Sequence, residues 1–349
     1  MSLEVAALSK SFRSGSRHFR SDGSVAEPVQ ALDGVSFSVA CGEVVALVGN
    51  NGAGKSTLMS IAAGLMAADE GTVTVMGHET TANGGTPTHH LGLAPQEEAL
   101  YPTLSARRNL AYFGSLAGLR GDPLDRRVAE VAGDLLLSEL LDRKARELSG
   151  GQRRRLHTGL ALMHDPEVLL LDEPTVGVDI DARLQLLQFV RDSAEAGAAV
   201  LYSTHQMTEV EQLASRVVVL DHGRVLAKGT VDELVATHSP PLGELRFNGS
   251  TVALPGPLSN DLDQIRTTQD DQTVAVVRLP EVSTTVADLV DQLGDEARGQ
   301  LVSAQIHAPS FENAYVRITR RVDASGTPVT PSPVTGGEAT SPGGDRGEP

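Results

Sequence analysis

Apolar runs and helical patterns alternate along the first 236 residues of the chain. Continuous apolar runs with the length of buried strands occur at 43–49, 167–174 and 198–205. Residues 55–66 follow the first of these runs and predict a helix. Residues 216–229 predict a hairpin with its turn at 221–223. This alternation is typical of an α/β domain with a largely parallel central sheet.

Strand patterns are missing between about residues 97 and 165, where helical patterns predict an inserted helical subdomain. In the last of these helical patterns, Leu156, Leu160 and Met163 fall on one face. The three arginines at 153–155 fall mostly off that face.

The pattern changes after residue 238 to short strands and helices. This change predicts an α/β domain over 1–238 and a separate small α+β accessory domain over 239–321. Residues 322–349 are rich in Gly, Pro, Ser, Thr and acidic residues. Such a segment buries too little apolar surface to fold, so it predicts a disordered tail.

Composition narrows the classes of function. The net charge of −16 and the pI of about 5.0 argue against nucleic acid and anionic lipid as partners. A lone cysteine, Cys41, excludes an internal disulfide and disfavours a thiolate metal site. The N-terminus lacks signal-peptide features, and the longest near-apolar stretch, 58–68, is shorter than the ~18 residues of a membrane span. We therefore expect a cytoplasmic protein.

The segment GNNGAGKST fits the phosphate-binding loop pattern and lies between a predicted strand and a predicted helix. Gly52 and Gly54 let backbone N–H groups turn toward phosphate oxygens, and the helix N-terminus favours an anion. Lys55 is expected to reach the β- and γ-phosphates, and Ser56 to supply an oxygen to Mg²⁺. The predicted nucleotide-binding residues are Gly49, Asn50, Asn51, Gly52, Ala53, Gly54, Lys55, Ser56 and Thr57.

Two adjacent acids end the predicted strand in LLLDEP. Asp172 is placed to hold Mg²⁺ through water, and Glu173 is expected to point to the opposite side of the strand end. A carboxylate there can orient and deprotonate the attacking water. Such a pair can also simply cap a loop, but together with a phosphate-binding loop it favours nucleotide hydrolysis.

A second glycine-rich segment, ELSGGQRRR at 147–155, also has the features of a phosphate site. Gly150 and Gly151 leave the backbone open to close approach, and a predicted helix begins there. Two further polar residues, Gln96 and His205, end apolar stretches. Each of these two, taken alone, is as well explained by a structural role.

The order and spacing of these motifs resemble those of ATP-binding cassette (ABC) transporter ATPases over about residues 3–236. The resemblance is carried by 49–57, Gln96, Ser149–Gln152, Asp172 with Glu173, Gly177–Asp179 and His205. It implies a P-loop NTPase domain of ABC type, with a mostly parallel core sheet, an antiparallel N-terminal β region and a helical subdomain. It also implies that the chain binds ATP with Mg²⁺ and hydrolyses it.

The resemblance implies a role for each matching residue. Glu173, His205 and Gln96 would be catalytic, with His205 meeting the γ-phosphate, and Gln96 would join Ser56 and Asp172 at the Mg²⁺. Nucleotide contacts would come also from the signature motif and the D-loop acid, namely Ser149, Gly150, Gly151, Gln152 and Asp179.

Some positions depart from the family pattern. The aromatic residue that stacks on adenine is usually tyrosine; here Phe12 holds that position, with Phe19 as the alternative. Relatives often have an acid before the Asn of the helix in the insert, where this chain has Arg108. That surface faces the membrane partner in the family, so the contact chemistry of the partner is expected to differ.

In this family two ATPase domains meet head to tail, so that the phosphate-binding loop of one and the signature motif of the other enclose one ATP. The resemblance therefore implies a second ATPase subunit, identical or different. It also implies integral membrane permease subunits, on which the chain sits at the inner face of the membrane. Residues 100–119 would form the groove for a permease helix.

Three phrases carry a closer resemblance to bacterial exporters of the drug-resistance and polyketide type. They are LYPTLSARRNLAYFGSLAGL, LDEPTVGVDIDAR and SFENAYVRITRR, the last of which is similar to the ending LEDVFLxLT. The implied function is to power export of a drug, an antibiotic or a lipid-like compound. An importer ATPase and a soluble ABC ATPase without a transport role remain alternatives.

Overall fold

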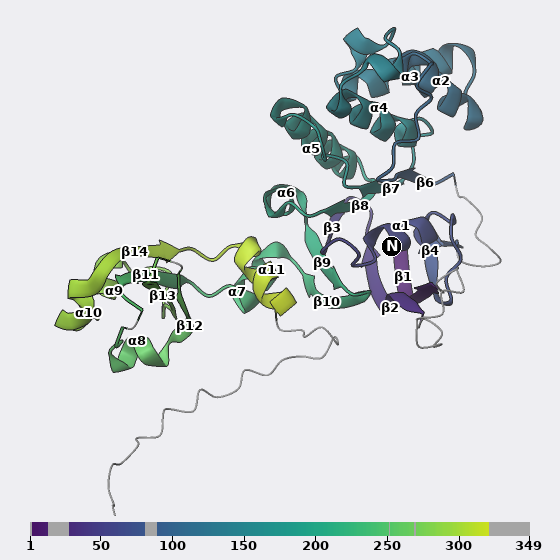
Figure 1. Cartoon of the computed structure of the whole chain (residues 1–349). Coiled ribbons are helices and arrows are strands. Elements are labelled where there is room, and N and C mark those ends of the chain that lie inside the picture. Colours follow the sequence, from purple (N-terminus) through teal and green to yellow (C-terminus); the bar gives the residue numbers. More distant parts are fainter. Residues whose placement is uncertain (1, 13–27, 81–88, 251, 269, 321–349) are drawn as a thin grey trace, which may run out of the picture.

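A computed structural model describes residues 2–12, 28–80, 89–250, 252–268 and 270–320. The part of the α/β domain that contains the β-sheets lies between the helical subdomain and the accessory domain (Figure 1). The predicted tail and Phe19 lie outside the described residues.

Among the described residues, the central sheet has six strands in the order β10-β9-β3-β8-β7-β6. The strands from β9 to β6 pair in parallel, and β10 pairs antiparallel with β9. Their bounds are β3 (Val44–Val48), β6 (Leu91–Ala94), β7 (Val168–Asp172), β8 (Ala199–Thr204), β9 (Arg216–Asp221) and β10 (Arg224–Gly229). Strands β3, β7 and β8 are buried along their whole length, as expected for a parallel sheet covered on both faces. The predicted parallel sheet and its terminal hairpin are confirmed.

An antiparallel sheet covers one face of the central sheet and helix α1 (Lys55–Ala62). Its strands, in the order β2-β1-β4-β5, are β1 (Leu3–Phe12), β2 (Val29–Val39), β4 (Glu70–Val75) and β5 (His78–Glu79). Alternate residues of β7 divide between the two sides. Val168 and Leu170 pack toward this sheet, whereas Leu169 and Leu171 pack toward the helices on the opposite face.

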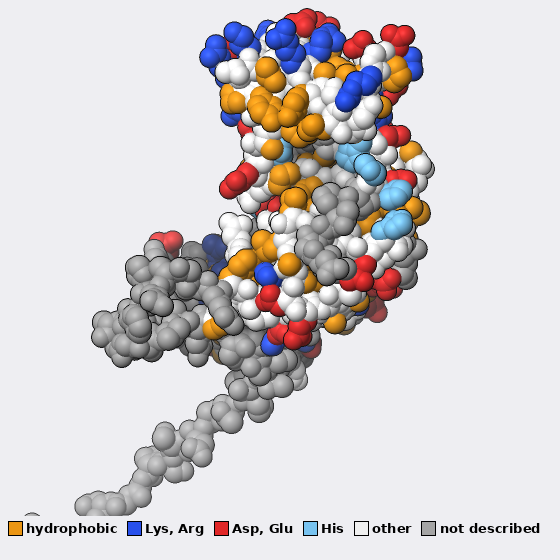
Figure 2. Space-filling model, turned by 90° about the vertical axis from the view of Figure 1, so that its right-hand side faces the viewer, with side chains coloured by type: hydrophobic (Ala, Val, Ile, Leu, Met, Phe, Trp, Pro, Cys, Tyr) orange, Lys and Arg blue, Asp and Glu red, His pale blue; other side chains and the backbone are white. Residues whose placement is uncertain are grey.

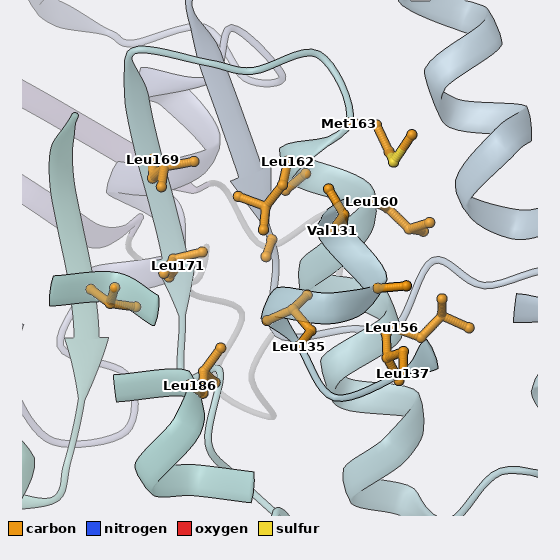
Figure 3. Close-up of a cluster of buried hydrophobic side chains, with 14 of the residues drawn as sticks. Val131, Leu135, Leu137, Leu156, Leu160, Leu162, Met163, Leu169, Leu171 and Leu186 are labelled. Atoms are coloured by element: carbon orange, nitrogen blue, oxygen red, sulfur yellow. The ribbon is translucent and has the colours of Figure 1, made fainter. Parts of the chain in front are cut away.

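The helical subdomain consists of α2 (Ala106–Leu116), α3 (Gly121–Asp134) and α4 (Gly150–Leu162), with 3₁₀ turns at Ser138–Leu140 and Ala145–Glu147. On the opposite face of the central sheet, α4 packs against β6 and α5 (Ile180–Glu195) packs against β3 and β8, while α2 and α3 pack against α4. Figure 3 shows Leu156 and Leu160 of α4 among the side chains of α3, with Leu169 and Leu171 of β7 nearby. One continuous apolar cluster therefore joins the subdomain to the sheet.

Two arginines of α4 are buried although the sequence pattern places them mostly off the leucine face of the helix. Arg154 and Arg155 are only 5% and 7% exposed. The physical reason is that α4 is covered on several sides, by β6, α2 and α3. Backbone carbonyls compensate the buried charge: Arg155 donates to the carbonyl oxygens of Leu135 and Leu136 at 2.8 and 3.0 Å.

The accessory segment has its own antiparallel sheet in the order β12-β13-β11-β14. Its strands are β11 (Leu242–Asn248), β12 (Leu262–Thr267), β13 (Gln272–Arg278) and β14 (Leu301–His307), and its helices are α8 (Gly256–Asn260), α9 (Val286–Asp291) and α10 (Asp295–Gln300). Leu245, Phe247 and Leu289 lie in a separate apolar core. This small α+β arrangement agrees with the pattern of the sequence.

The last helix, α11 (Phe311–Arg320), returns from the accessory sheet to the α/β domain (Figure 1). Phe311 and Ile318 are buried against β3 and β9, next to α6 (Met207–Leu213) and α7 (Val231–His238). On its other side, Arg317 forms an ion pair with Asp263 of β12 at 2.5 Å. This helix therefore connects the accessory sheet to the strand that leads into the phosphate-binding loop.

His157 of α4 is a buried titratable group, only 3% exposed. Its Nδ1 has no hydrogen-bond partner among the described residues. Burial, and to a lesser degree the positive charge of Arg154, lowers the pKa of His157 to about 4. The folded protein therefore keeps this imidazole neutral in a pH range where the unfolded chain protonates it.

We predict that His157 makes the folded state less stable in acid. Between its unfolded pKa and about pH 4 the unfolded state binds the extra proton, so the free energy of unfolding falls as the pH falls through this window. At pH 5 the loss relative to pH 7 is about 2 kcal/mol. Urea unfolding at both pH values measures it. The variant His157→Leu should lack this share of the loss, and an identical pH dependence in both proteins would contradict the prediction.

Candidate functional site

The phosphate-binding loop connects the end of β3 to the start of α1. It turns through Gly52 and Gly54, which have φ angles of 84° and 107°. A Cβ atom on Gly54 would lie 2.4 Å from the carbonyl oxygen of Ala31, so this position requires glycine for its φ and for its close approach. Gly54 gives α1 no side-chain cap, which leaves the first N–H groups of the helix to an anion.

Lys55 is buried at the centre of this loop. Its Nζ donates to the carbonyl oxygens of Gly49 and Asn50 at 2.8 and 3.3 Å. It also lies 3.8 Å from Oε1 of Glu173, which is equally buried. The loop therefore brings its lysine next to one of the two acids predicted from the sequence.

Parallel pairing of β7 with β8 fixes the positions of the two acids, Asp172 and Glu173. The register sets Asp172 opposite Ser203, whose hydroxyl donates to Oδ1 of Asp172. The same Ser203 Oγ accepts from the backbone N–H of Glu173 at 3.0 Å. Glu173 adopts a φ of 49°, a left-handed conformation that costs on the order of 1–3 kcal/mol for such a residue. Backbone strain at an acid that faces a buried lysine marks a functional position.

His205 follows the end of β8, and its side chain is about half exposed. Its Nδ1 lies 3.4 Å from Oε1 of Glu173. Because β3, β7 and β8 run parallel, their carboxyl ends meet at one edge of the sheet. Lys55 and His205 therefore both approach Glu173, although the three residues are far apart in the sequence.

Two pockets open at this edge. One, of about 360 Å³, is lined by Ala31, Asn51–Thr57, Gln96 and Glu173. A second, of about 450 Å³, contains Ser56, Gln96 and Asp172 among its lining residues. These three residues offer hydroxyl, amide and carboxylate oxygens, which are the donors that Mg²⁺ prefers. The predicted metal residues thus line one pocket next to the phosphate-binding loop, and the donor set fits a magnesium ion.

Ser149 and Gln152 form a reciprocal cap at the start of α4. Ser149 Oγ accepts from the backbone N–H of Gln152 at 3.3 Å, and Gln152 Oε1 accepts from the N–H of Ser149 at 3.0 Å. Gly151 lies against the D-loop, because a Cβ there would be 3.1 Å from Cα of Val178. Asp179 caps α5 by accepting from the N–H of Ala182 at 2.9 Å. The signature segment, Ser149–Gln152, therefore lies next to the segment that contains Asp179.

The predicted site residues fall into two groups: those that line the pocket around Lys55, and those that lie outside it. In the described part of the chain, the pocket around Lys55 has no lining residue from Ser149–Gln152 and none from the D-loop. Phe12 ends β1 and is 39% exposed, but it is not part of this pocket either. Its ring lies 5.9 Å from Nζ of Lys10.

Ser203 and Arg154 are site residues that the sequence analysis missed. Ser203 holds both acids, and Arg154 donates to the carbonyl oxygens of Gln96 and Glu173 at 2.6 and 2.9 Å. A polar residue inside the apolar run of β8 was an available signal for Ser203. Nothing local distinguishes Arg154 from its neighbours.

A further apolar surface lies on the helical subdomain. Tyr101, Tyr112 and Leu116 are 44%, 42% and 67% exposed, and the two tyrosine rings are in edge contact at 5.1 Å. Figure 2 shows hydrophobic side chains gathered on this subdomain beneath a rim of lysines and arginines. Large exposed apolar groups of this kind mark interaction surfaces. Within the described residues, no helix combines the length and apolar character needed to cross a membrane.

Comparisons with known proteins agree with this geometry. The family model described as ABC transporter matches residues 32–176. The linearmycin resistance ATP-binding protein LnrL of Bacillus subtilis is 36% identical over 300 residues, covering 83% of this chain and 94% of the relative. The daunorubicin/doxorubicin resistance ATP-binding protein DrrA of Streptomyces peucetius is 36% identical, covering 63% of this chain and 66% of the relative.

A solved structure of the ATP-binding subunit of an ABC transporter superimposes with a TM-score of 0.58 at 29% identity, covering 68% of this chain and 93% of that subunit. The match to the family model includes the phosphate-binding loop and both acids. The resemblance drawn from the motifs is therefore confirmed. The chain belongs to the ABC transporter family, as an ATP-binding subunit that hydrolyses ATP.

Proposed function

We propose that the chain powers the export of an antibiotic-like or lipid-like compound through separate membrane subunits. The observation that carries the catalytic part is the convergence of Lys55, Glu173 and His205 at one sheet edge. The exporter part is supported by the resistance proteins to which the chain is similar over most of its length. An importer ATPase would share the same catalytic residues, but LnrL and DrrA are both named as resistance proteins.

Each residue of the edge has a distinct task in the proposed hydrolysis. The open N-terminus of α1 and Lys55 bind the phosphates. Glu173 orients and deprotonates the attacking water, and His205, which faces the same carboxylate, contacts the γ-phosphate. Ser56, Gln96 and Asp172 would hold Mg²⁺, which neutralises charge that develops on the phosphate oxygens.

We predict that Glu173→Gln slows phosphate release about 10²–10⁴-fold, because the amide cannot act as a base. The variant should accumulate an ATP-bound dimer, which size-exclusion chromatography with ATP and Mg²⁺ detects. The matched control is Glu167→Gln, at a half-exposed glutamate just before the same strand. Hydrolysis at the parent rate in Glu173→Gln would remove this residue from the proposed role.

The signature segment acts on a second ATPase subunit in this proposal. Ser149–Gln152 lies apart from the pocket of its own chain, yet it has the open glycines and the helix N-terminus of a phosphate site. Val176 and Ile180, which flank the D-loop beside it, are 45% and 76% exposed. A two-fold pair would cover these residues and bring each signature segment over the ATP of the partner.

We predict that Ser149→Arg leaves ATP binding to the isolated subunit within about 2-fold, because Ser149 is outside that pocket. Introduced into Glu173→Gln, it should abolish the ATP-dependent dimer by filling the interface. Lys55→Ala is the contrasting variant, since it should weaken binding of ATP to the subunit itself. Equilibrium binding of a fluorescent ATP analogue separates the two. Equal loss of binding in both variants would contradict a site shared between subunits.

The exposed apolar surface of the helical subdomain is the proposed contact for the membrane subunits. Tyr101, Tyr112 and Leu116 lie within the stretch that is similar to exporter subunits. Docking there would hold the chain at the inner face of the membrane.

We predict that Leu116→Arg prevents recovery of the chain with integral membrane subunits, because a charge in an apolar contact is costly. The chain would be co-expressed with the membrane-protein genes that neighbour its own gene. Leu65→Arg is the matched control, since Leu65 is also 67% exposed but lies on the catalytic core. Basal ATP hydrolysis should be unchanged in both. Equal membrane recovery of the two variants, or recovery with ribosomes or DNA, would overturn this contact.

A further inference from the structure

Arg154 occupies an unusual place between catalytic segments. It is 5% exposed, and its guanidinium donates to carbonyl oxygens on two different segments. Nη1 donates to Gln96 at 2.6 Å and to Pro95 at 3.3 Å. Nη2 donates to Glu173 at 2.9 Å and also to Asp172. One side chain thus bridges the backbone of two predicted Mg²⁺ residues and of the proposed base.

The energetic setting of Arg154 argues against a role in stability alone. Its Nε has no hydrogen-bond partner among the described residues, and burial lowers the pKa of Arg154. Burying an ion costs several kcal/mol, and apolar residues of the same volume often serve stability as well or better. The backbone segments that Arg154 holds in place explain why a buried cation is present here despite the cost of its burial.

The shape of the guanidinium explains how it holds these segments. It is planar and rigid, and its two outer nitrogens point in fixed directions. One nitrogen is bonded to the segment after β6, and the other to the end of β7. The guanidinium therefore holds the carbonyl oxygens of Gln96 and Glu173 at a fixed separation. Since Arg154 belongs to α4, that distance is also tied to the helix that Ser149 begins.

We propose that Arg154 is a positioning residue, which fixes the backbone of Gln96 relative to that of Glu173 and links both to the signature helix. It lines neither pocket of the site and acts through the backbone of these two residues. The inference deepens the proposed function, on which it rests for the roles of Gln96 and Glu173. A shift of α4 against a partner subunit would then reach the base of its own chain through this one side chain.

Arg155 provides a matched comparison within the same helix. It is 7% exposed, its pKa is also lowered by burial, and it too donates to two carbonyl oxygens. Those carbonyls belong to Leu135 and Leu136, which line neither site pocket. Both arginines therefore carry the cost of burial, but the carbonyl oxygens bound by Arg154 belong to the segments of Gln96 and Glu173, whereas those bound by Arg155 do not.

The test compares Arg154→Lys with Arg155→Lys in the full-length chain. A lysine keeps the charge, but its ammonium cannot span both segments as the planar fork does. We expect Arg154→Lys to lower kcat about 10- to 100-fold per folded molecule, with KM for ATP and affinity of the isolated subunit within about 3-fold. Arg155→Lys should keep kcat within about 2-fold, whatever it does to the melting temperature.

A second readout does not depend on turnover. Hydrogen exchange, followed by mass spectrometry, should speed up at residues 94–98 and 172–176 in Arg154→Lys and stay unchanged there in Arg155→Lys. Arg154→Gln, which buries no charge, gives the same comparison if the lysine variant does not fold. Parent-like kcat with parent-like exchange in the Arg154 variant would overturn the proposal, as would equal losses in both variants. If Glu173→Gln proves fully active, the catalytic assignment fails, and the exchange comparison still decides whether Arg154 positions the two segments.

Discussion

Parallel pairing of β3, β8 and β7 is the constraint on which the rest of the molecule depends. Its register aligns Val48 with Thr204 and Asp172 with Ser203, so that the three carboxyl ends finish together. Asp172, Glu173 and His205 lie at or next to these ends, and the phosphate-binding loop follows the end of β3. The pairing holds because both faces of the sheet are covered, and alternate side chains of each strand enter separate apolar cores. A substitution that disturbs either apolar core would therefore act on the site by changing the strand register, and not by direct contact with the site residues.

Two buried cations approach Glu173 from different directions. Lys55 faces its carboxylate, and Arg154 binds its carbonyl oxygen. In a chain with a net charge of −16, ATP must be attracted by local groups, because the overall field opposes it. The helix N-terminus, the lysine and the backbone N–H groups of the loop supply that attraction. The local arrangement of charge, and not the total charge, determines what the pocket accepts.

The motifs that could be predicted from the sequence are those whose chemistry is local. The residues of the phosphate-binding loop follow one another in the sequence, and so do the two acids. Each of these motifs comes after a strand that is a plain apolar run, so sequence and structure agree there. The burial of Arg154 could not be predicted, because the helix is covered by segments that are distant in the sequence. Helical periodicity describes one buried face, whereas α4 has several. The role of Ser203 depended likewise on strand register, which the sequence does not display.

The return of α11 changes how the accessory domain relates to the site. The apolar face of α11 lies in one cluster with Val48 and Val219. Tyr315 Oη of the same helix donates to the side-chain oxygen of Asn50 in the phosphate-binding loop at 3.2 Å. The opposite side of α11 is held to the accessory sheet by the ion pair of Arg317 with Asp263. Since the partners of Phe311 and Ile318 lie in the core, the accessory sheet cannot shift as a free body. A displacement must either separate Arg317 from Asp263 or move α11 against the strand that carries the loop.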